Sequence, residues 1–467
     1  MLFNSFHFLL FFPLVCILYY LLWPRLRWLF LLLASYYFYM NWEPVYALLI
    51  AGSTLITYGC GLLVERYRGE RRRQRLFLLG SLLLNFGILF IFKYYNFLTG
   101  SIFSLLSWLG IRSAFPEFTL LLPVGISFYT FQAVGYSLDV YRGDIKAERH
   151  LGIYALFVSF FPQLVAGPIE RARNLLPQFR EIHRFDETNA TQGLKLMLWG
   201  YFMKLCVADR LALYVDAVYN NVSQHNGTSL LIASVFFAFQ IYCDFGGYSL
   251  IAIGAARVMG FSLMENFRRP YFARSVREFW GRWHISLSTW FKDYVYIPLG
   301  GNRVGRFRHM RNLVVTFLVS GIWHGANWTF ILWGGFHGGA QVMEKLMVRS
   351  TGDNKYKWGG VKIFITFLLV CFGWIFFRAN RVEDAFEVIR KIFTEPGPPF
   401  IHLTTVFFGV ISLVILLLKD IADEYRLPFH FLDSRYVVIR YFSVCALVAY
   451  ILLFGMLNGG QFIYFQF

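Results

Sequence analysis

The chain is organised around two blocks, WGRWHISLSTWFKDYVYIPLGGNR at residues 280–303 and GIWHGANWTFILWGGFHG at residues 321–338. They hold three of its ten histidines, His284, His324 and His337, the last two in Gly- and Trp-rich sequence that predicts turns between apolar segments. Ionisable side chains at membrane depth are costly, and their default interpretation is functional. These blocks therefore predict a site, provided that the surrounding sequence is membrane-embedded.

Composition indicates a membrane protein. Of 467 residues, 57% are hydrophobic, 20% aromatic and only 15% charged, whereas soluble domains carry about 25% charged residues. The net charge of +17 is typical of basic cytoplasmic loops beside anionic lipid, and we do not expect a nucleic-acid partner. The six cysteines lie singly, which supports neither a disulfide framework nor a zinc site, so we predict no bound metal.

Apolar segments of bilayer-spanning length recur along the chain. The arginine-rich loop between Arg66 and Arg75 is expected in the cytoplasm, because positive loops stay inside. Counting back through three spans then puts the N-terminus in the periplasm. We predict about eleven transmembrane helices among twelve apolar segments: 6–23, 28–42, 44–64, 76–92, 118–138, 195–218, 230–259, 313–322, 328–346, 363–377, 404–418 and 441–457.

Two regions are expected not to cross. Residues 151–165 are apolar but short and have basic sequence on both sides, which predicts a re-entrant or broken helix buried in protein. Residues 260–312 are too polar to span. Within them, Ser275 and Glu278 have capping-box spacing and predict the start of an amphipathic helix. Its aromatic face would carry Trp280, Trp283, His284, Leu287 and Phe291.

The candidate chemistry starts from the histidines. Imidazole, with an unperturbed pKa of about 6.5, suits proton transfer near neutral pH, so we interpret His324 as a general base and His284 as catalytic or substrate-orienting. The alternative for each histidine, and for Asp244, is a buried side chain that serves only packing. The sequence contains no HExxH, GxSxG or P-loop pattern. The basic residues between Arg268 and Arg311 either face lipid or bind the phosphates of an anionic donor.

The chain resembles the membrane-bound O-acyltransferases of the alginate O-acetyltransferase type, a branch close to the peptidoglycan O-acetyltransferase membrane subunit. The resemblance covers most of the chain. Besides the two histidine blocks it is carried by PVGISFYTFQAVGYSLDVYRGD, FPQLVAGPIER, MENFRRPY, GWIFFRA and the terminal FIYFQF. It implies an all-α polytopic fold in which a ring of tilted helices surrounds a central funnel.

The resemblance also implies an activity. The histidine of the GxWHG motif, His324, would be catalytic, and His284 would be the second motif histidine. The enzyme would pass acetyl from acetyl-CoA, with no permanently bound cofactor, across the bacterial inner membrane to a cell-envelope polysaccharide such as peptidoglycan or alginate. A periplasmic SGNH-type O-acetyltransferase would be the partner, because no segment of this sequence is long enough to form a glycan-binding domain. A non-enzymatic transporter or polysaccharide export channel is the competing hypothesis.

We further assign donor or substrate binding to five residues: Asp244, Trp283, Asn327, His337 and Arg282. We expect one membrane domain over residues 1–467. Within it, residues 1–259 would hold the N-terminal spans, residues 260–346 the re-entrant catalytic region with both motif histidines, and residues 347–467 the C-terminal spans.

Overall fold

The computed structural model describes residues 1–111, 114–118, 122–165, 167–351, 359–428, 430–457 and 462–463. Over these residues the chain forms helices and turns without any strand, so the predicted all-α fold is confirmed. They group into two compact units. Unit 1 comprises Met1–Gly193 with Ala255–Met264, and unit 2 comprises Leu194–Gly254 with Glu265–Phe467. The single domain predicted over the whole chain stays a prediction.

Several helices expose apolar side chains along most of their length, as lipid-facing helices do. α20 (Val437–Phe454) buries only Leu447 and Ile451 along its length and leaves bulky apolar side chains such as Phe442 exposed, which suits a hydrocarbon surrounding. Among the described residues, five helices are long and apolar enough to span: Pro44–Arg66, Arg71–Trp108, Gly227–Val258, Gly359–Arg378 and Val437–Phe454. The chain is therefore a multi-pass membrane protein. The predicted number of spans and the ring around a funnel stay predictions.

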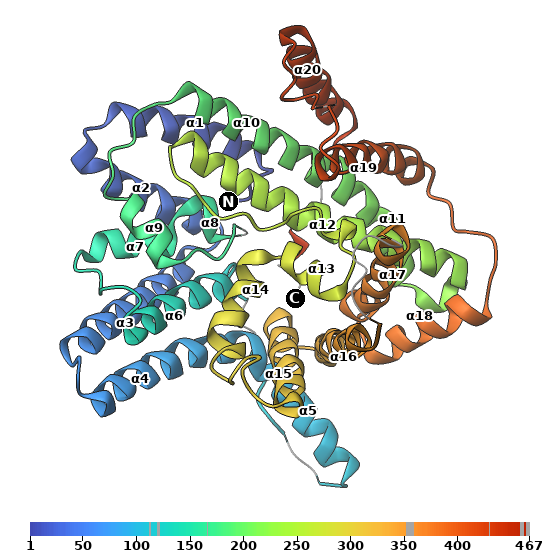
Figure 1. The fold of residues 1–467 in the computed structure, drawn as a ribbon, viewed down its shortest axis with the longest axis horizontal. Helices are drawn as coiled ribbons and strands as arrows, with labels where there is room; N and C mark the ends of the chain where they lie inside the picture. Colours follow the sequence, from blue (N-terminus) through green and yellow to red (C-terminus); the bar gives the residue numbers. More distant parts are fainter. Residues whose placement is uncertain are drawn as a thin grey trace. The chain divides into compact units, whose positions relative to one another are not determined.

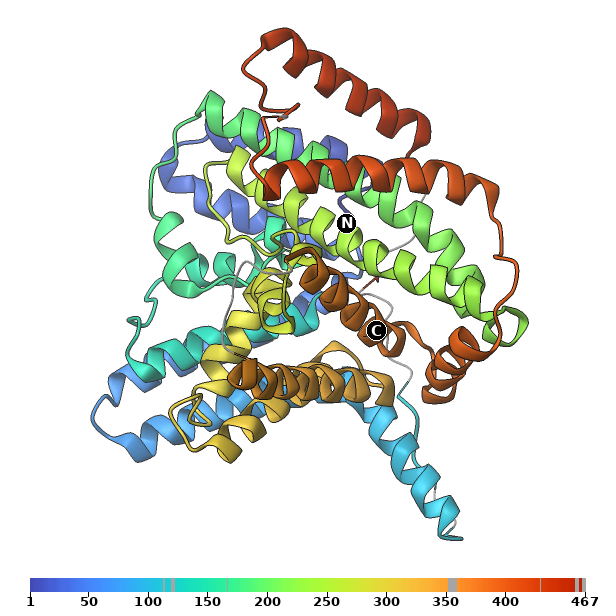
Figure 2. The same ribbon diagram turned by 45° about the vertical axis from the view of Figure 1, so that its right-hand side comes forward.

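In unit 1, the helix α3 contacts several of its neighbours. Figures 1 and 2 both show α3 and α4 side by side, and α3 also packs against α6 and α7. The predicted span over residues 118–138 begins later than expected, at Ile126 after the left-handed Gly125, and residues 119–121 lie outside the described part. The helices of unit 1 are α1 (Phe6–Leu21), α2 (Pro24–Met40), α3 (Ala47–Arg66), α4 (Arg71–Leu89), α5 (Tyr95–Trp108), α6 (Ile126–Arg142), α7 (Leu151–Ser159), α8 (Phe161–Leu164) and α9 (Ala172–Gln178).

The segment over residues 151–165 is broken, as predicted. α7 ends at Ser159 and α8 begins at Phe161, with Pro162 in its first turn, where the missing N–H is not needed. A helix end leaves carbonyls without an intrahelical partner. Here Gln132 Nε2 donates to Phe157 O at 2.6 Å. A side chain from α6 thus satisfies a buried carbonyl at the break.

Unit 2 carries both histidine blocks. The chain enters it within α10 (Glu187–Tyr201), leaves it after Gly254 near the end of α12 (Gly227–Val258), and returns at Glu265 in the segment that follows α12. Its helices after α10 are η3 (Phe202–Ala208), α11 (Asp209–Tyr219), α12, α13 (Val276–Arg282), α14 (Ile285–Phe291), η6 (Lys292–Tyr296), α15 (Arg306–His324), α16 (Trp328–Thr351), α17 (Gly359–Arg378), α18 (Val382–Thr394), α19 (Val410–Glu424) and α20. α18 was not predicted, because it is amphipathic and not continuously apolar.

The continuous amphipathic helix predicted after Ser275 is wrong. Ser275 does cap α13, accepting from Glu278 N at 3.0 Å, but the helix ends at Arg282 and His284 adopts a left-handed conformation with φ 42°. The peptide groups freed by the break bond the neighbouring segment: Ile285 N donates to Asn266 O at 2.8 Å. Trp280, Trp283 and His284 therefore share no single helical face with Leu287 and Phe291. The 3.6-residue periodicity could not reveal a break that a distant segment stabilises.

The turn predicted at His324 is confirmed, and the turn predicted at His337 is wrong. His324 ends α15 and the next helix begins at Trp328, whereas His337 lies inside α16. The glycines around His337 instead allow close packing of α15 on α16. A Cβ on Gly334 would stand 2.4 Å from Phe317 O, and one on Gly321 would stand 2.3 Å from Phe330 O.

We predict that Gly334→Ala lowers the midpoint of thermal unfolding of the detergent-solubilised protein. The added methyl group meets backbone and forces the two helices apart, and overpacking of this kind typically costs about 1–3 kcal/mol. Gly339→Ala, in the same helix with no atom within 4 Å of the new Cβ, is the matched control. It should leave the midpoint unchanged or raise it, because alanine favours helix by up to ~1 kcal/mol over glycine. Equal midpoints for the two variants would contradict the close packing.

Candidate active site

His284 lies at the joint between α13 and α14, and its side chain is fully buried. Its Nδ1 is 3.1 Å from Asn266 Oδ1, which also accepts from Ser286 Oγ at 2.9 Å. Asn266 Nδ2 donates to Ser249 Oγ at 3.0 Å, which fixes the orientation of the amide. Because an amide oxygen can only accept, the imidazole carries its proton on Nδ1. In the neutral ring, Nε2 is therefore the nitrogen that can take up a proton.

One indole lies against both histidines that were predicted to be catalytic. The ring centroid of Trp323 is 6.0 Å from that of His284 and 5.0 Å from that of His324. His324 is buried, and the rings of Trp333 and Phe377 approach it edge-on at 4.8 and 5.3 Å. The structure thus brings His284 and His324 into one aromatic cluster of unit 2.

His337 belongs to the same cluster. The Trp333 ring, which contacts His324, also lies 5.0 Å from the His337 ring. Trp280 Nε1 donates to His337 Nδ1 at 3.3 Å, so the proton of the neutral ring sits on Nε2. Among the described residues this Nε2 has no hydrogen-bond partner. It points at α17, where a Cβ on Gly373 would stand only 2.8 Å away.

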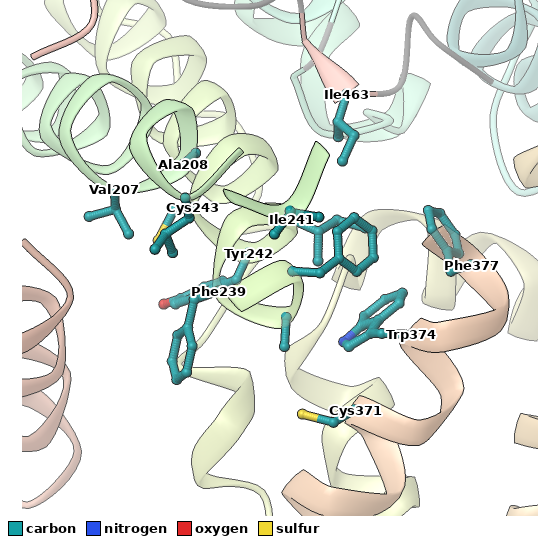
Figure 3. Close-up of a cluster of buried hydrophobic side chains, with 14 of the residues drawn as sticks. Val207, Ala208, Phe239, Ile241, Tyr242, Cys243, Cys371, Trp374, Phe377 and Ile463 are labelled. Carbon is teal, nitrogen blue, oxygen red and sulfur yellow. The ribbon is translucent and has the colours of Figure 1, made fainter. Parts of the chain in front are cut away.

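Three of the other predicted site residues have clear structural partners. Asp244 is buried and forms an ion pair with Lys204 at 2.5 Å. Trp283 is buried, with its ring 4.9 Å from that of Trp374; Figure 3 shows Trp374 and Phe377 of α17 beside the α12 residues of the core. Asn327 caps the start of α16, where its Oδ1 accepts the backbone N–H two residues further on at 3.1 Å.

Arg282 ties α13 to α19. Its Nη1 and Nη2 each lie 2.9 Å from a carboxylate oxygen of Glu424, and Nη2 also reaches Glu278 at 2.7 Å. Burial alone would raise the pKa of Glu424, but hydrogen bonds from Arg282 and Arg269 outweigh it and hold that pKa below its usual value. The binding roles assigned to Asp244, Trp283, Asn327, His337 and Arg282 stay predictions.

A cavity of about 730 Å³ opens beside the histidine cluster within unit 2. Three lining residues connect it to the histidines. Trp280 donates to His337, Ile285 directly follows His284 in the sequence, and Ser320 lies one helical turn before His324. The lining residues are Arg277, Trp280, Gly281, Ile285, Leu287, Ser288, Thr289, Phe291, Lys292, Tyr296, Asn302, His309, Leu313, Thr316, Phe317, Ser320, Gln341, Glu344 and Lys345. In the part of the chain that the structure describes, the three clustered histidines are adjacent to this cavity and are not part of its lining.

The charged residues that line the cavity are mostly basic. They are three cations, Arg277, Lys292 and Lys345, and one carboxylate, Glu344. Burial, and then the charges of Lys345 and Arg277, lower the pKa of His309, which bonds Tyr296 OH at 2.8 Å. This excess of positive charge would disfavour a cation, whereas phosphate groups would gain charge-assisted hydrogen bonds. Among the described residues, no group of three or more His, Cys, Asp or Glu side chains could hold a metal ion.

The fold and the site together define a multi-pass membrane protein with buried histidines in an aromatic cluster beside a basic cavity. The chain belongs to the membrane-bound O-acyltransferase family, whose pattern matches residues 148–383. It is therefore an acyltransferase, as predicted, and not a non-enzymatic transporter. The matched region includes both histidine blocks.

Curated relatives agree with this assignment. The chain is 42% identical over 396 residues to the probable alginate O-acetylase of Pseudomonas putida, covering 84% of this chain and 80% of the relative. It is 35% identical over 410 residues to the peptidoglycan O-acetyltransferase of Helicobacter pylori, covering 82% and 76%. It is also 30% identical over 340 residues to the teichoic acid D-alanyltransferase of Streptococcus thermophilus, covering 67% and 78%.

Sequence reasoning missed the residues that orient and connect the histidines. Asn266, which fixes the His284 tautomer, and Trp323 and Trp333, which join the histidines, were not singled out. Trp323 and Trp333 both lie in the block around His324, so proximity to the motif could have suggested them. Asn266 lies in MENFRRPY, a stretch that the resemblance includes, but no spacing rule links it to His284.

We predict that Asn266→Leu lowers acyl transfer more than Asn266→Asp does. Leucine removes the acceptor that holds the His284 proton on Nδ1, whereas aspartate keeps an acceptor there. The loss with leucine should lie within the roughly 10²–10⁴-fold that proton transfer contributes. Initial rates of acyl transfer by purified variants, matched for monodisperse yield, measure the order. A leucine variant as active as the aspartate variant would exclude this orienting role.

Proposed function

We propose that the chain takes acetyl from acetyl-CoA at the cytoplasmic face of the bacterial inner membrane and passes it towards a cell-envelope polysaccharide. The observation that carries the proposal is the row of His284, Trp323 and His324 in one buried cluster beside a basic cavity. A general base must be held within hydrogen-bond reach of the proton that it removes. A thioester donor with anionic phosphates needs a positive surface nearby.

In this proposal His324 is the general base. Its neutral imidazole removes the proton from an acceptor hydroxyl while the hydroxyl oxygen attacks the thioester carbonyl. The tetrahedral intermediate then collapses, the C–S bond breaks, and the proton passes to the departing CoA thiolate. His284, held with a basic Nε2 by Asn266, orients the donor or assists the proton movement. No metal or permanently bound cofactor is required.

The basic cavity is the proposed donor site. CoA carries a diphosphate and a further phosphate, and the cations Arg277, Lys292 and Lys345 would bind them while the acyl arm extends past Trp280 towards the cluster. The cavity volume of about 730 Å³ lies within the ~300–1,000 Å³ range of small-molecule sites. Trp283, Asn327, His337, Asp244 and Arg282 would support this site from the surrounding helices.

The acceptor would be reached from the periplasm through a second protein. Two relatives are named for the acetylation of alginate and of peptidoglycan, and we propose a polysaccharide of this kind as the final acceptor. A periplasmic SGNH-type O-acetyltransferase would present the hydroxyl, because a water-excluding path for a small acyl group is too narrow for a polymer. This geometry requires a periplasmic N-terminus, with the loop between Arg66 and Arg75 in the cytoplasm.

We predict that His324→Ala abolishes acetyl transfer while the protein still inserts in the membrane. Loss of a general base costs roughly 10²–10⁴-fold in rate. His430→Ala, which removes an exposed histidine of the same unit, should keep wild-type activity. The assay supplies radiolabelled acetyl-CoA, the purified chain and the partner, with and without glycan. Near-normal transfer by His324→Ala, or efficient acetylation of glycan without the partner, would refute the corresponding part of the proposal.

We predict that Lys292→Gln combined with Lys345→Gln raises the KM for acetyl-CoA about tenfold and leaves kcat within about twofold. Hydrogen bonds to charged groups contribute about 1.5–3 kcal/mol each, reduced here because both lysines are exposed. The control is Lys362→Gln, which removes an exposed cation of α17 outside the cavity lining. Steady-state kinetics at two salt concentrations separate phosphate binding from general charge. An unchanged KM would show that the donor binds elsewhere.

A further inference from the structure

Three charged side chains are buried together in unit 2, away from the histidine cluster. Lys204 Nζ lies 2.5 Å from Asp244 Oδ1 and 2.8 Å from Asp209 Oδ1, and all three residues are almost inaccessible. Lys204 comes from η3, Asp209 from the start of α11 and Asp244 from the middle of α12. One cation thus faces two carboxylates. The carboxylates of this buried charge cluster carry more negative charge than the single ammonium group neutralises.

A further hydrogen-bond donor to this cluster comes from the C-terminal part of the sequence. Ile463 N donates to Asp244 Oδ2 at 2.7 Å, and Phe462 and Ile463 are both buried. Figure 3 shows the Ile463 side chain directed towards the hydrophobic core around Ile241. Of the terminal FIYFQF stretch only these two residues lie in the described part. The Asp244 carboxylate thus accepts hydrogen bonds from both an ammonium group and a backbone N–H. Charge-assisted hydrogen bonds are short and have strict geometry, so they fix the position of the donating groups.

The chain before these residues is held by the same helical segment. Arg210 donates from Nε and Nη2 to Phe454 O at 2.9 and 2.7 Å, and Met456 N donates to Leu205 O at 3.0 Å. The end of α20 is thus tied to Leu205 and Arg210, which directly follow Lys204 and Asp209 in the sequence. Both the end of α20 and residues 462–463 are therefore hydrogen-bonded to the segment that carries the buried charge cluster or to the cluster itself.

The anchored residues are linked to His284 through one intervening aromatic ring. The Phe462 ring lies 5.4 Å from that of Phe245 and 4.8 Å from that of Tyr248. The Phe245 ring in turn meets the His284 ring edge-on at 4.6 Å. Phe245 directly follows Asp244 in α12, so one turn of helix holds both the anchor for Ile463 and the ring between Phe462 and His284.

We propose that the buried charge cluster is a positioning device: it holds residues 462–463 against Phe245, so that the Phe245 ring stays packed on His284 and keeps the imidazole in place. Asp244 then acts through the terminal segment and does not contact the donor. This inference rests on the proposed catalytic role of the histidine cluster. It separates two roles for Asp244, because a donor-binding residue affects KM, whereas a positioning residue affects kcat.

The test compares Asp244→Leu, Asp244→Asn and the control Asp433→Asn in the full-length purified protein. Asp433 belongs to an exposed ion pair with Lys195 in the same unit. Removal of Asp244 leaves Lys204 paired with Asp209, one cation with one carboxylate, so the fold should tolerate it. We expect Asp244→Leu to lower kcat about 10- to 100-fold with the KM for acetyl-CoA within twofold. Asp244→Asn keeps an oxygen acceptor and should retain more activity, and Asp433→Asn should match wild type.

Hydrogen–deuterium exchange of the C-terminal peptide provides a readout independent of chemistry. The Ile463 amide should be protected in the wild type and in Asp433→Asn, and should exchange at least tenfold faster in Asp244→Leu. If protection is equal in all variants, the anchoring is refuted. If protection is lost but kcat is unchanged, the segment does not position His284. A raised KM with unchanged kcat would instead assign Asp244 to donor binding.

A second variant keeps the inference testable if Asp244→Leu fails to fold. Phe462→Ala leaves the charge cluster intact and removes only the ring that contacts Phe245. It should lower kcat with little change in KM, and full activity would overturn the inference. The exchange measurement also distinguishes failure of this inference from failure of the proposed function. If His324→Ala proved fully active while the Ile463 amide remained protected through Asp244, the catalytic assignment would fall and the anchoring would stand.

Discussion

A helix that breaks inside a protein interior leaves backbone N–H and C=O groups that water cannot reach and that need other hydrogen-bond partners. The arrangement of unit 2 depends on the partners that one such break has found. At the joint between α13 and α14, the Asn266 backbone accepts from Ile285, and its side chain binds the ring of His284. The same residue thus stabilises the break and orients the buried histidine that lies at it. A left-handed backbone at a non-glycine residue is uncommon, and here it coincides with a buried, oriented imidazole.

The glycines of the second histidine block solve a related packing problem. α15 and α16 approach so closely that side chains at Gly321 and Gly334 would collide with backbone carbonyls of the opposite helix. Small residues at helix interfaces are a common means of close packing in membranes, where lipid offers no hydrophobic driving force between helices. The close approach brings Trp333 of α16 against His324 of α15, and the same indole reaches His337. Helix packing and the geometry of the site therefore have one cause.

Charge is used differently in three places in unit 2. At the cavity, unbalanced cations favour an anionic ligand. Between α13 and α19, Arg282 and Glu424 form a bidentate pair that links two elements. At the Lys204 cluster the ion pairs are buried, and loss of the cation would be strongly destabilising because it would leave two buried carboxylates uncompensated. Only the first of these three arrangements leaves charge available for a small ligand, which is why the donor site is proposed there.

The sequence by itself determined the class of protein, the positions of most apolar helices and the residues around which the site forms. Composition, apolar length and the break over residues 151–165 depend on local chain properties, and the histidine blocks are contiguous motifs. Tertiary structure alone decided the break at His284, the helical setting of His337 and the partners of Asp244 and Arg282. Each of these depends on a segment distant in sequence: Asn266 for His284, and Ile463 for Asp244. Periodicity records which face of a helix is apolar, but a hydrogen bond from a remote residue leaves no periodic trace.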